Sequence, residues 1–281
     1  CCCLRYQRRL LASMNKLIAI LLLSTVTCFG DSKFVRGKFV SGAMPYAYVA
    51  PPSNGLLNNI KSYWSYDSSG TPSAGSAAMS NNGGGAAFIG SGLINSGVDC
   101  PLWGDSTAGF YALSTLIDIS KDFTASVWVA PYEASGPGGQ CGTILNLING
   151  YSQAFGFSLD QTGAQVSYNF TDGVDNGGGS AAVTWSANEW IHFVFVNDST
   201  NGELNVYING VYTDTVGTLP MTTTVNCELD VLTDFLATPF GCGSTYARSD
   251  EVGVWQTKLT PTQISTLYNS GSGYPFSSFN N

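Results

Sequence analysis

NEWIHFVFVNDSTNGELNVYINGV, residues 188–211, carries the densest strand signal in the chain. Apolar residues alternate with their neighbours in two runs, residues 191–196 and 204–209, with the period of two shown by half-buried strands. Residues 197–202, between the runs, are types that tolerate left-handed backbone or bond their own backbone, and Asn209-Gly210 forms a second such pair. The stretch therefore predicts a β-hairpin followed by a tight turn.

This hairpin resembles one in the laminin-G-like, concanavalin-A-like jelly rolls. In that family a Trp-x-His strand precedes an acidic, glycine-containing turn and a Leu-x-Val-Tyr-x-Asn-Gly strand, much as Trp190 and His192 precede residues 204–210 here. Residues 55–67, 122–129 and 250–264 match three more segments of the family in the same order. The resemblance covers roughly residues 55–268 and implies an all-β, antiparallel, two-sheet jelly-roll sandwich. It implies no single function, because the fold hosts lectins, adhesins, virion proteins and glycosidases.

Other segments from residue 55 onward fit a sandwich. Turn residues separate short runs with strand character at residues 63–67, 86–94, 123–129, 142–148, 154–159 and 165–170. One short C-terminal helix is expected from Thr260, because Thr260 and Gln263 have the spacing of a capping box and Pro261 suits the first helical position. Gly271 is expected to end this helix.

The N-terminal residues 1–30 predict export. Residues 1–13 have no core pattern and precede Met14, which we take as the start. Lys16, an apolar run at residues 17–26 and small residues before Asp31 indicate a secretory signal peptide, too short to span a membrane. A lipoprotein anchored through Cys28 and an uncleaved anchor are the alternatives. We therefore expect a secreted protein with no membrane span after signal cleavage.

The charge balance argues against one class of partner. Cleavage near Gly30 leaves all nineteen acidic residues and seven of the eleven basic ones, a formal charge of −12. Nucleic-acid binding needs a basic face, so we expect no nucleic-acid partner. An acidic surface suits solubility and cation binding.

Residues 31–54 differ from the body, residues 55–281, in composition. They contain three prolines and three basic residues, Lys33, Arg36 and Lys38. Composition favours an extended arm or linker. The alternative is a strand that docks on a neighbouring copy of the chain and builds a polymer, since a basic arm and an acidic body are complementary.

Four cysteines follow residue 30: Cys100, Cys141, Cys227 and Cys242. Of the three possible pairings we favour Cys227–Cys242, because these two flank one long loop, with Cys100–Cys141 as the other disulfide. A Cys₄ zinc site is the alternative, although no Cys-x-x-Cys pair is present among them. Asn169 and Asn197 match the glycosylation pattern, which applies if the source secretes through a eukaryotic pathway.

No catalytic residue is predicted. A retaining glycosidase needs two carboxylates about 5 Å apart, and only residues 228–230 begin a suitable Glu-x-Asp pattern, which residues 232–233 break. Four other glutamates stand singly in expected turns or strand ends: Glu133, Glu189, Glu203 and Glu251. The single histidine, His192, lies mid-strand, where a hydrogen-bonded structural role is favoured over that of a base.

A calcium site is implied by the resemblance. Jelly rolls of this family often hold structural Ca²⁺, and the Asp of the closing strand, here Asp250, is implied as a ligand together with Asp67. Carboxylate and carbonyl oxygens suit this ion. Residues 172–177 are a rival acidic loop, for which a solvated turn is the simpler interpretation.

The strand alternation also suggests a ligand surface. The face opposite the expected core carries four aromatic residues: Trp128, His192, Tyr207 and Trp255. Exposed, they would stack on sugar rings. Covered by the helix and long loops, they would form a second small core.

These observations favour a secreted, non-catalytic, carbohydrate- or cell-surface-binding module, lectin-like or adhesin-like, with a glycan or cell-surface partner. A self-assembling extracellular or virion structural protein that uses residues 31–54 is the alternative. A glycan-active enzyme comes third.

Overall fold

The computed structural model describes residues 53–67, 69–81, 83–101, 108–112, 117–134, 142–149, 153–160, 165–218, 221, 227–233 and 243–280. Two compact units are present, residues 1–50 and 51–281, and all described residues belong to the second. The expected signal peptide, Cys28 and nearly all of the arm lie outside the described residues. Among the residues described, no helix is long and apolar enough to cross a membrane.

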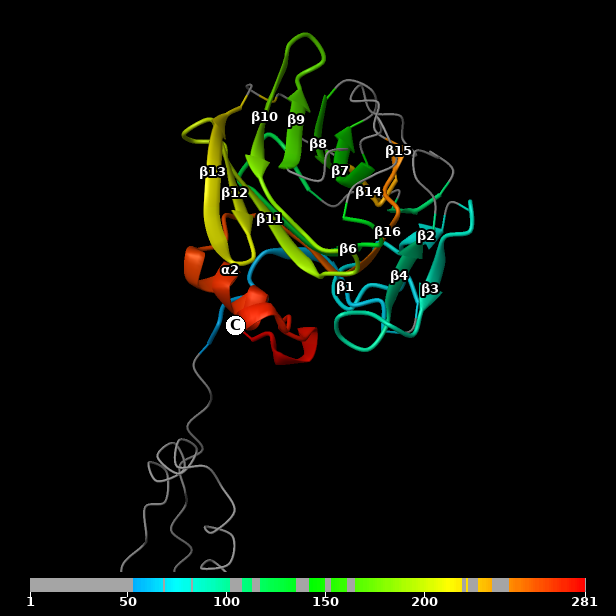
Figure 1. Ribbon diagram of the computed structural model, residues 1–281. Helices are drawn as coiled ribbons and strands as arrows, with labels where there is room; N and C mark the ends of the chain where they lie inside the picture. The colour runs from blue at the N-terminus through cyan, green and yellow to red at the C-terminus, as the bar shows by residue number, and fades with distance from the viewer. Residues whose placement is uncertain are drawn as a thin grey trace, which may run out of the picture. The chain divides into compact units, whose positions relative to one another are not determined.

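The expected two-sheet jelly-roll sandwich is confirmed (Figure 1). Across the first sheet the strand order is β13 (Val211–Gly217), β12 (Glu203–Ile208), β11 (Ile191–Asp198), β6 (Phe123–Pro131), β16 (Ala247–Trp255), β4 (Gly97–Cys100) and β3 (Ala87–Ile89), with β1 (Ile60–Trp64) paired to β16. The second sheet has the order β10 (Asn176–Ala182), β9 (Gln165–Thr171), β8 (Gln153–Leu159), β7 (Gly142–Asn149), β14 (Glu228–Val231), β5 (Phe110–Ala112) and β2 (Ser80–Asn81), with β15 (Gly243–Ser244) paired to β7. Neighbouring strands are antiparallel, except that β15 runs parallel to β7.

The main core fills the space between the sheets. Phe193 and Phe195 of β11 point into it, as the alternation predicts, and are fully buried. The ring of Phe195 stacks on that of Phe157 of β8, with 3.6 Å between ring centroids. Packing across the two inner faces supplies most of the apolar burial that stabilises the sandwich.

The β-hairpin predicted within residues 188–211 is also confirmed. Strands β11 and β12 pair from Phe193↔Ile208 to Asp198↔Glu203 and are joined by residues 199–202. Asn209 and Gly210 connect β12 to β13 with φ values of 51° and 75°. Two consecutive residues with positive φ match the twist of the flanking strands, which explains the Asn-Gly pair.

The C-terminal helix α2 (Pro261–Tyr268) begins as predicted. Thr260 is the N-cap, and its side chain and that of Gln263 form both bonds of the capping box. The expected end at Gly271 is wrong, because Asn269 adopts the left-handed conformation and caps the helix. Two 3₁₀ turns follow, Asn269–Gly271 and Phe276–Ser278.

Candidate functional site

The four aromatic residues considered for a sugar-stacking face do lie on the outer side of the first sheet, but that side is covered. Helix α2 and the residues after it pack there and form a second core with Trp255, Tyr63 and Val194. Trp128, His192 and Trp255 are 2 %, 0 % and 0 % exposed. The structure therefore matches the second-core interpretation for these three rings, while Tyr207 is half-buried at the margin.

His192 is held at the centre of this face. Its ring stacks on Trp128 at 4.7 Å, and Trp128 stacks on Tyr268 of α2 at 5.7 Å. The imidazole Nε2 lies 2.8 Å from Ser126 Oγ. Burial lowers the pKa of His192 to about 3, so the ring is neutral at physiological pH.

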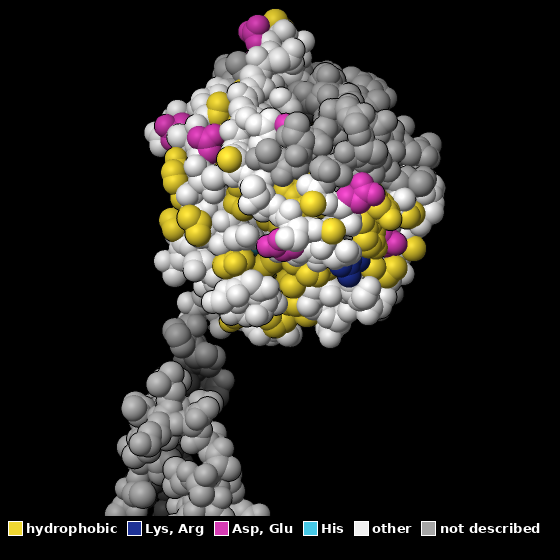
Figure 2. All heavy atoms as spheres, in the orientation of Figure 1, with side chains coloured by type: hydrophobic (Ala, Val, Ile, Leu, Met, Phe, Trp, Pro, Cys, Tyr) yellow, Lys and Arg dark blue, Asp and Glu magenta, His cyan; other side chains and the backbone are white. Residues whose placement is uncertain are grey.

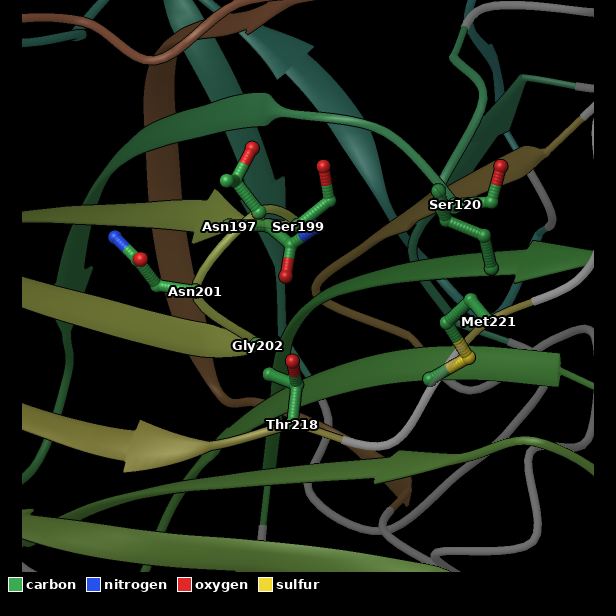
Figure 3. Close-up of a pocket in the computed structure, with 9 residues that line it drawn as sticks. Ser120, Asn197, Ser199, Asn201, Gly202, Thr218 and Met221 are labelled. Carbon is green, nitrogen blue, oxygen red and sulfur yellow. The ribbon is translucent and has the colours of Figure 1, made fainter.

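A hollow of about 400 Å³ opens beside the turn that joins β11 to β12. We call it the hairpin hollow. The described residues that line it are Ile119, Ser120, Asn197, Ser199, Thr200, Asn201, Gly202, Thr218 and Met221. Figure 3 shows side chains of the turn grouped on one side of the hollow, with Ser120 and Met221 across from them. Hydroxyl and amide groups dominate this lining; Met221 adds apolar surface, while Ile119 is fully buried behind it.

Charged groups next to the hollow fix the shape of the turn. Asp122 Oδ1 accepts hydrogen bonds from the backbone N and Oγ of Ser199, at 3.0 and 2.8 Å. Asp198 accepts bonds from the backbone N and Nδ2 of Asn201, at 3.1 and 2.9 Å. The ammonium of Lys258 lies 2.8 Å from Asp198 Oδ2 and 3.6 Å from Asp122 Oδ2. A hydrogen bond from Lys258 lowers the pKa of Asp198, so this carboxylate is ionised when it holds the turn.

The two expected glycosylation sites differ in accessibility. Asn169 lies half-buried on β9. Asn197 is 3 % exposed, and its Nδ2, the atom that would carry a glycan, donates to the carbonyl of Lys121 at 2.9 Å. The folded chain therefore encloses the Asn197 amide instead of presenting it for glycosylation.

A second polar site lies in β16, where two consecutive carboxylates are buried. Asp250 is 0 % and Glu251 is 2 % exposed. Asp250 accepts backbone hydrogen bonds from Ile94 at 2.9 Å and from Glu251 at 2.8 Å. Neither carboxylate oxygen of Glu251 accepts a hydrogen bond of normal geometry from a described residue, although its interaction with the Tyr63 hydroxyl lowers the pKa of Glu251 in opposition to burial. Burial raises the pKa of Asp250 to about 9 and that of Glu251 to about 7, and the negative charge of Glu251 adds to the effect on Asp250.

Asp67 and Asp250 are hydrogen-bonded to neighbouring residues of one loop, Asn95 and Ile94. Asp67 accepts a hydrogen bond from Asn95 Nδ2 at 3.0 Å, and Asn95 belongs to the same loop as Ile94. No group of three or more His, Cys, Asp or Glu side chains that could hold a metal together occurs in the described part of the chain. The orphaned oxygens of Glu251 nevertheless fit a cation, because a buried pair of carboxylates is costly unless it is protonated or compensated. The expectation that Glu251 lies in a turn or at a strand end is wrong, because Glu251 is in the middle of β16.

Asp172, in the rival acidic loop, accepts backbone hydrogen bonds from Val174 and Asp175 in the β9–β10 turn. Cys100 and Cys227 are buried. Their expected partners, Cys141 and Cys242, lie outside the described residues, so both disulfides stay predictions.

The family follows from a comparison of the sequence with family models. Residues 104–265 match the model described as the concanavalin A-like lectin/glucanases superfamily, and the chain belongs to this superfamily. No curated protein sequence matches the chain.

Solved structures share the fold at low sequence identity. Domain 4 of AbnA, a GH43 extracellular arabinanase from Geobacillus stearothermophilus in complex with arabinotriose, matches with a TM-score of 0.57 and 18% identity, over 74% of this chain and 97% of that domain. The botulinum neurotoxin serotype G binding domain matches with a TM-score of 0.56 and 18% identity, over 75% of this chain and 50% of its own length. The binding domain of Paraclostridial Mosquitocidal Protein 1 matches with a TM-score of 0.57 and 14% identity, over 76% and 52%. The chain thus spans about half the length of the toxin binding domains that it matches.

Proposed function

We propose that this chain is a secreted, non-catalytic carbohydrate-binding module that recognises a glycan through the hairpin hollow. The observation that carries the proposal is the lining of the hollow. Hydroxyl and amide groups suit the hydroxyls of a sugar, while the half-buried Met221 offers apolar surface to its C–H face. No Asp or Glu is among the described residues of the lining.

The comparisons support a binding role. One similar structure is a domain of an extracellular arabinanase in complex with arabinotriose, and another is a botulinum neurotoxin serotype D ligand-binding domain in complex with N-acetylneuraminic acid. Each of these two structures is a complex with a saccharide. A glycan, free or on a cell surface, is therefore the partner that we assign to the chain.

A glycan array and titration calorimetry test this function. We expect the full-length chain to bind at least one saccharide, and Thr200→Trp to lose that binding, because Thr200 lines the hollow on an exposed turn and the indole would fill the space. Val174→Trp adds the same bulk at a side chain that is 86 % exposed and does not line the hollow, and should bind as the wild type does. Binding that survives in Thr200→Trp would place the ligand elsewhere.

We also propose that Asp250 and Asp67 supply ligands to a structural Ca²⁺ that lies beside Glu251. The cation would neutralise the buried carboxylates and steady the loop that contains Ile94 and Asn95. These side chains supply part of the shell of about six to eight oxygens that calcium prefers.

Thermal unfolding with and without a chelator tests the calcium site. Chelation should lower the melting temperature of the wild type by about 5 °C or more, since an ion that binds only the folded state stabilises it. Asp250→Asn should remove this response, whereas Asp172→Asn, the same change in the β9–β10 turn, should keep it. An unchanged melting temperature in the wild type would end the calcium proposal.

A further inference from the structure

Two of the four hydroxyl groups that line the hairpin hollow, those of Ser120 and Ser199, donate their hydrogen to the protein. Ser120 Oγ donates to Asp118 at 2.5 Å, and Ser199 Oγ donates to Asp122 at 2.8 Å. A hydroxyl has one hydrogen, so each serine can offer a ligand only its lone pairs. One N–H of Asn201 Nδ2 donates to Asp198, and the carbonyl oxygen of the same side chain is an acceptor.

Asn197, a buried residue of the lining, adds to this bias. Its Nδ2 donates to the Lys121 carbonyl, while its Oδ1 is buried and has no hydrogen-bond partner among the described residues. An unpaired buried carbonyl is costly, and a donor that reached it would recover that cost. Donors on the ligand therefore gain more here than acceptors do.

Charge acts in the same direction. Three carboxylates, those of Asp118, Asp122 and Asp198, lie directly behind the lining, and the one cation bonded to them in the described residues is Lys258. No lining residue among those described is basic. Figure 2 shows a similar balance over one face of the molecule, where acidic side chains are scattered and basic ones are sparse. An anionic ligand would meet both repulsion and a shortage of donors.

We infer that the hairpin hollow selects a sugar residue rich in hydrogen-bond donors, either neutral and hydroxylated or carrying a protonated amine, and discriminates against carboxylated, sulfated and phosphorylated sugars. This inference rests on the proposed carbohydrate-binding function and adds the class of sugar.

Matched monosaccharides test the inference directly. Glucose, glucosamine and glucuronic acid share one ring and differ in a hydroxyl, an ammonium or a carboxylate, and galactose, galactosamine and galacturonic acid form a second series. Saturation-transfer NMR on the full-length chain at pH 7 and constant ionic strength ranks them. In the series that binds, we expect the amino sugar to bind at least as tightly as the neutral sugar, and the uronic acid to bind at least tenfold more weakly.

A single substitution separates selection from mere stability. In Asp122→Asn the new amide can donate to Ser199 Oγ, which frees the serine hydroxyl to donate to a ligand. The ratio of neutral-sugar to uronic-acid affinity should then fall by threefold or more. Asp172→Asn should leave this ratio unchanged. If Asp122 had a purely structural role, the substitution would weaken the binding of all sugars equally and leave the affinity ratio unchanged. That result would overturn the inference that the hollow selects ligands rich in hydrogen-bond donors.

The outcomes distinguish the two proposals. If no saccharide of either series and no glycan on the array binds, the carbohydrate function itself fails. If a uronic acid or N-acetylneuraminic acid binds as tightly as the neutral sugars, the function stands and the donor-rich selection is wrong. If Ca²⁺ or Na⁺ alone displaces the amino sugar while neutral sugars do not bind, the hollow is a cation site and the inference is overturned.

Discussion

Replacement of Trp255 by phenylalanine should destabilise the fold without affecting the binding of a saccharide. The indole is fully buried in the second core, and its Nε1 donates to the carbonyl of Leu56 at 2.8 Å. Loss of this bond leaves a buried carbonyl unpaired, at about 1–3 kcal/mol. The smaller ring also leaves a cavity beside Tyr63, which costs about 1–2 kcal/mol by comparison with other large-to-small core changes. The free energy of unfolding should therefore fall by about 2–5 kcal/mol.

Urea unfolding followed by circular dichroism measures this change, with saccharide affinity determined on the same samples. Tyr212→Phe is the control, because Tyr212 is 51 % exposed and its loss of a hydroxyl should change stability by less than about 0.5 kcal/mol. If Trp255→Phe were as stable as the wild type and had lost saccharide binding, the ring would be an exposed ligand contact. The assignment of the aromatic face to a second core would then be refuted.

Three further predictions concern charge. With a chelator present, the free energy of unfolding should fall as the pH rises from about 5 to 9. Burial raises the pKa of Glu251 to about 7 and that of Asp250 to about 9, so the folded chain holds protons that the unfolded chain releases. Urea midpoints at pH 5, 7 and 9 check this, and Asp250→Asn should flatten the profile. Lys258→Met should cost about 1 kcal/mol of stability or less, since the ion pair is partly exposed, yet weaken saccharide binding severalfold by releasing the turn, as calorimetry would show. His192, the single histidine of the chain, has a pKa lowered to about 3 by burial and should show no proton-NMR titration between pH 4 and 8; a midpoint near 6.5 would contradict its burial.

Much of the fold could be predicted from the sequence where a local signal coincides with burial. The alternation in residues 191–196 reports the two faces of β11 correctly, because both faces pack against apolar layers of different composition. The capping box at Thr260 and the Asn209-Gly210 turn depend on local backbone chemistry alone, and both were predicted.

Strand β10 was not predicted, and its composition explains why. Gly177 and Gly179 lack side chains that could alternate, and they pair with β9 at Phe170 and Tyr168. The aromatic rings of these two residues lie over the glycines, where a β-carbon would collide with them. The aromatic residues of β9, and not the residues of β10 itself, therefore determine the packing that favours this strand.

The candidate sites depended on contacts that no local pattern reveals. The turn at residues 199–202 was recognised, but the hairpin hollow also needs Ser120, Thr218 and Met221, which come from other parts of the chain. Glu251 was missed because simple alternation places consecutive residues on opposite faces of a sheet. The pairing of β16 with β6 shifts register between Asp250 and Gly253, and Glu251 has a φ of 50°, so two consecutive carboxylates become buried.

The location of the ligand is the most direct test of the proposed function. Backbone amide shifts of the ¹⁵N-labelled full-length chain should be followed while the tightest-binding saccharide of the array is added. We expect the largest shifts at Ser120, Ser199, Asn201, Gly202 and Thr218, around the hairpin hollow. Shifts confined to another surface, with these five amides unmoved at saturation, would contradict this expectation.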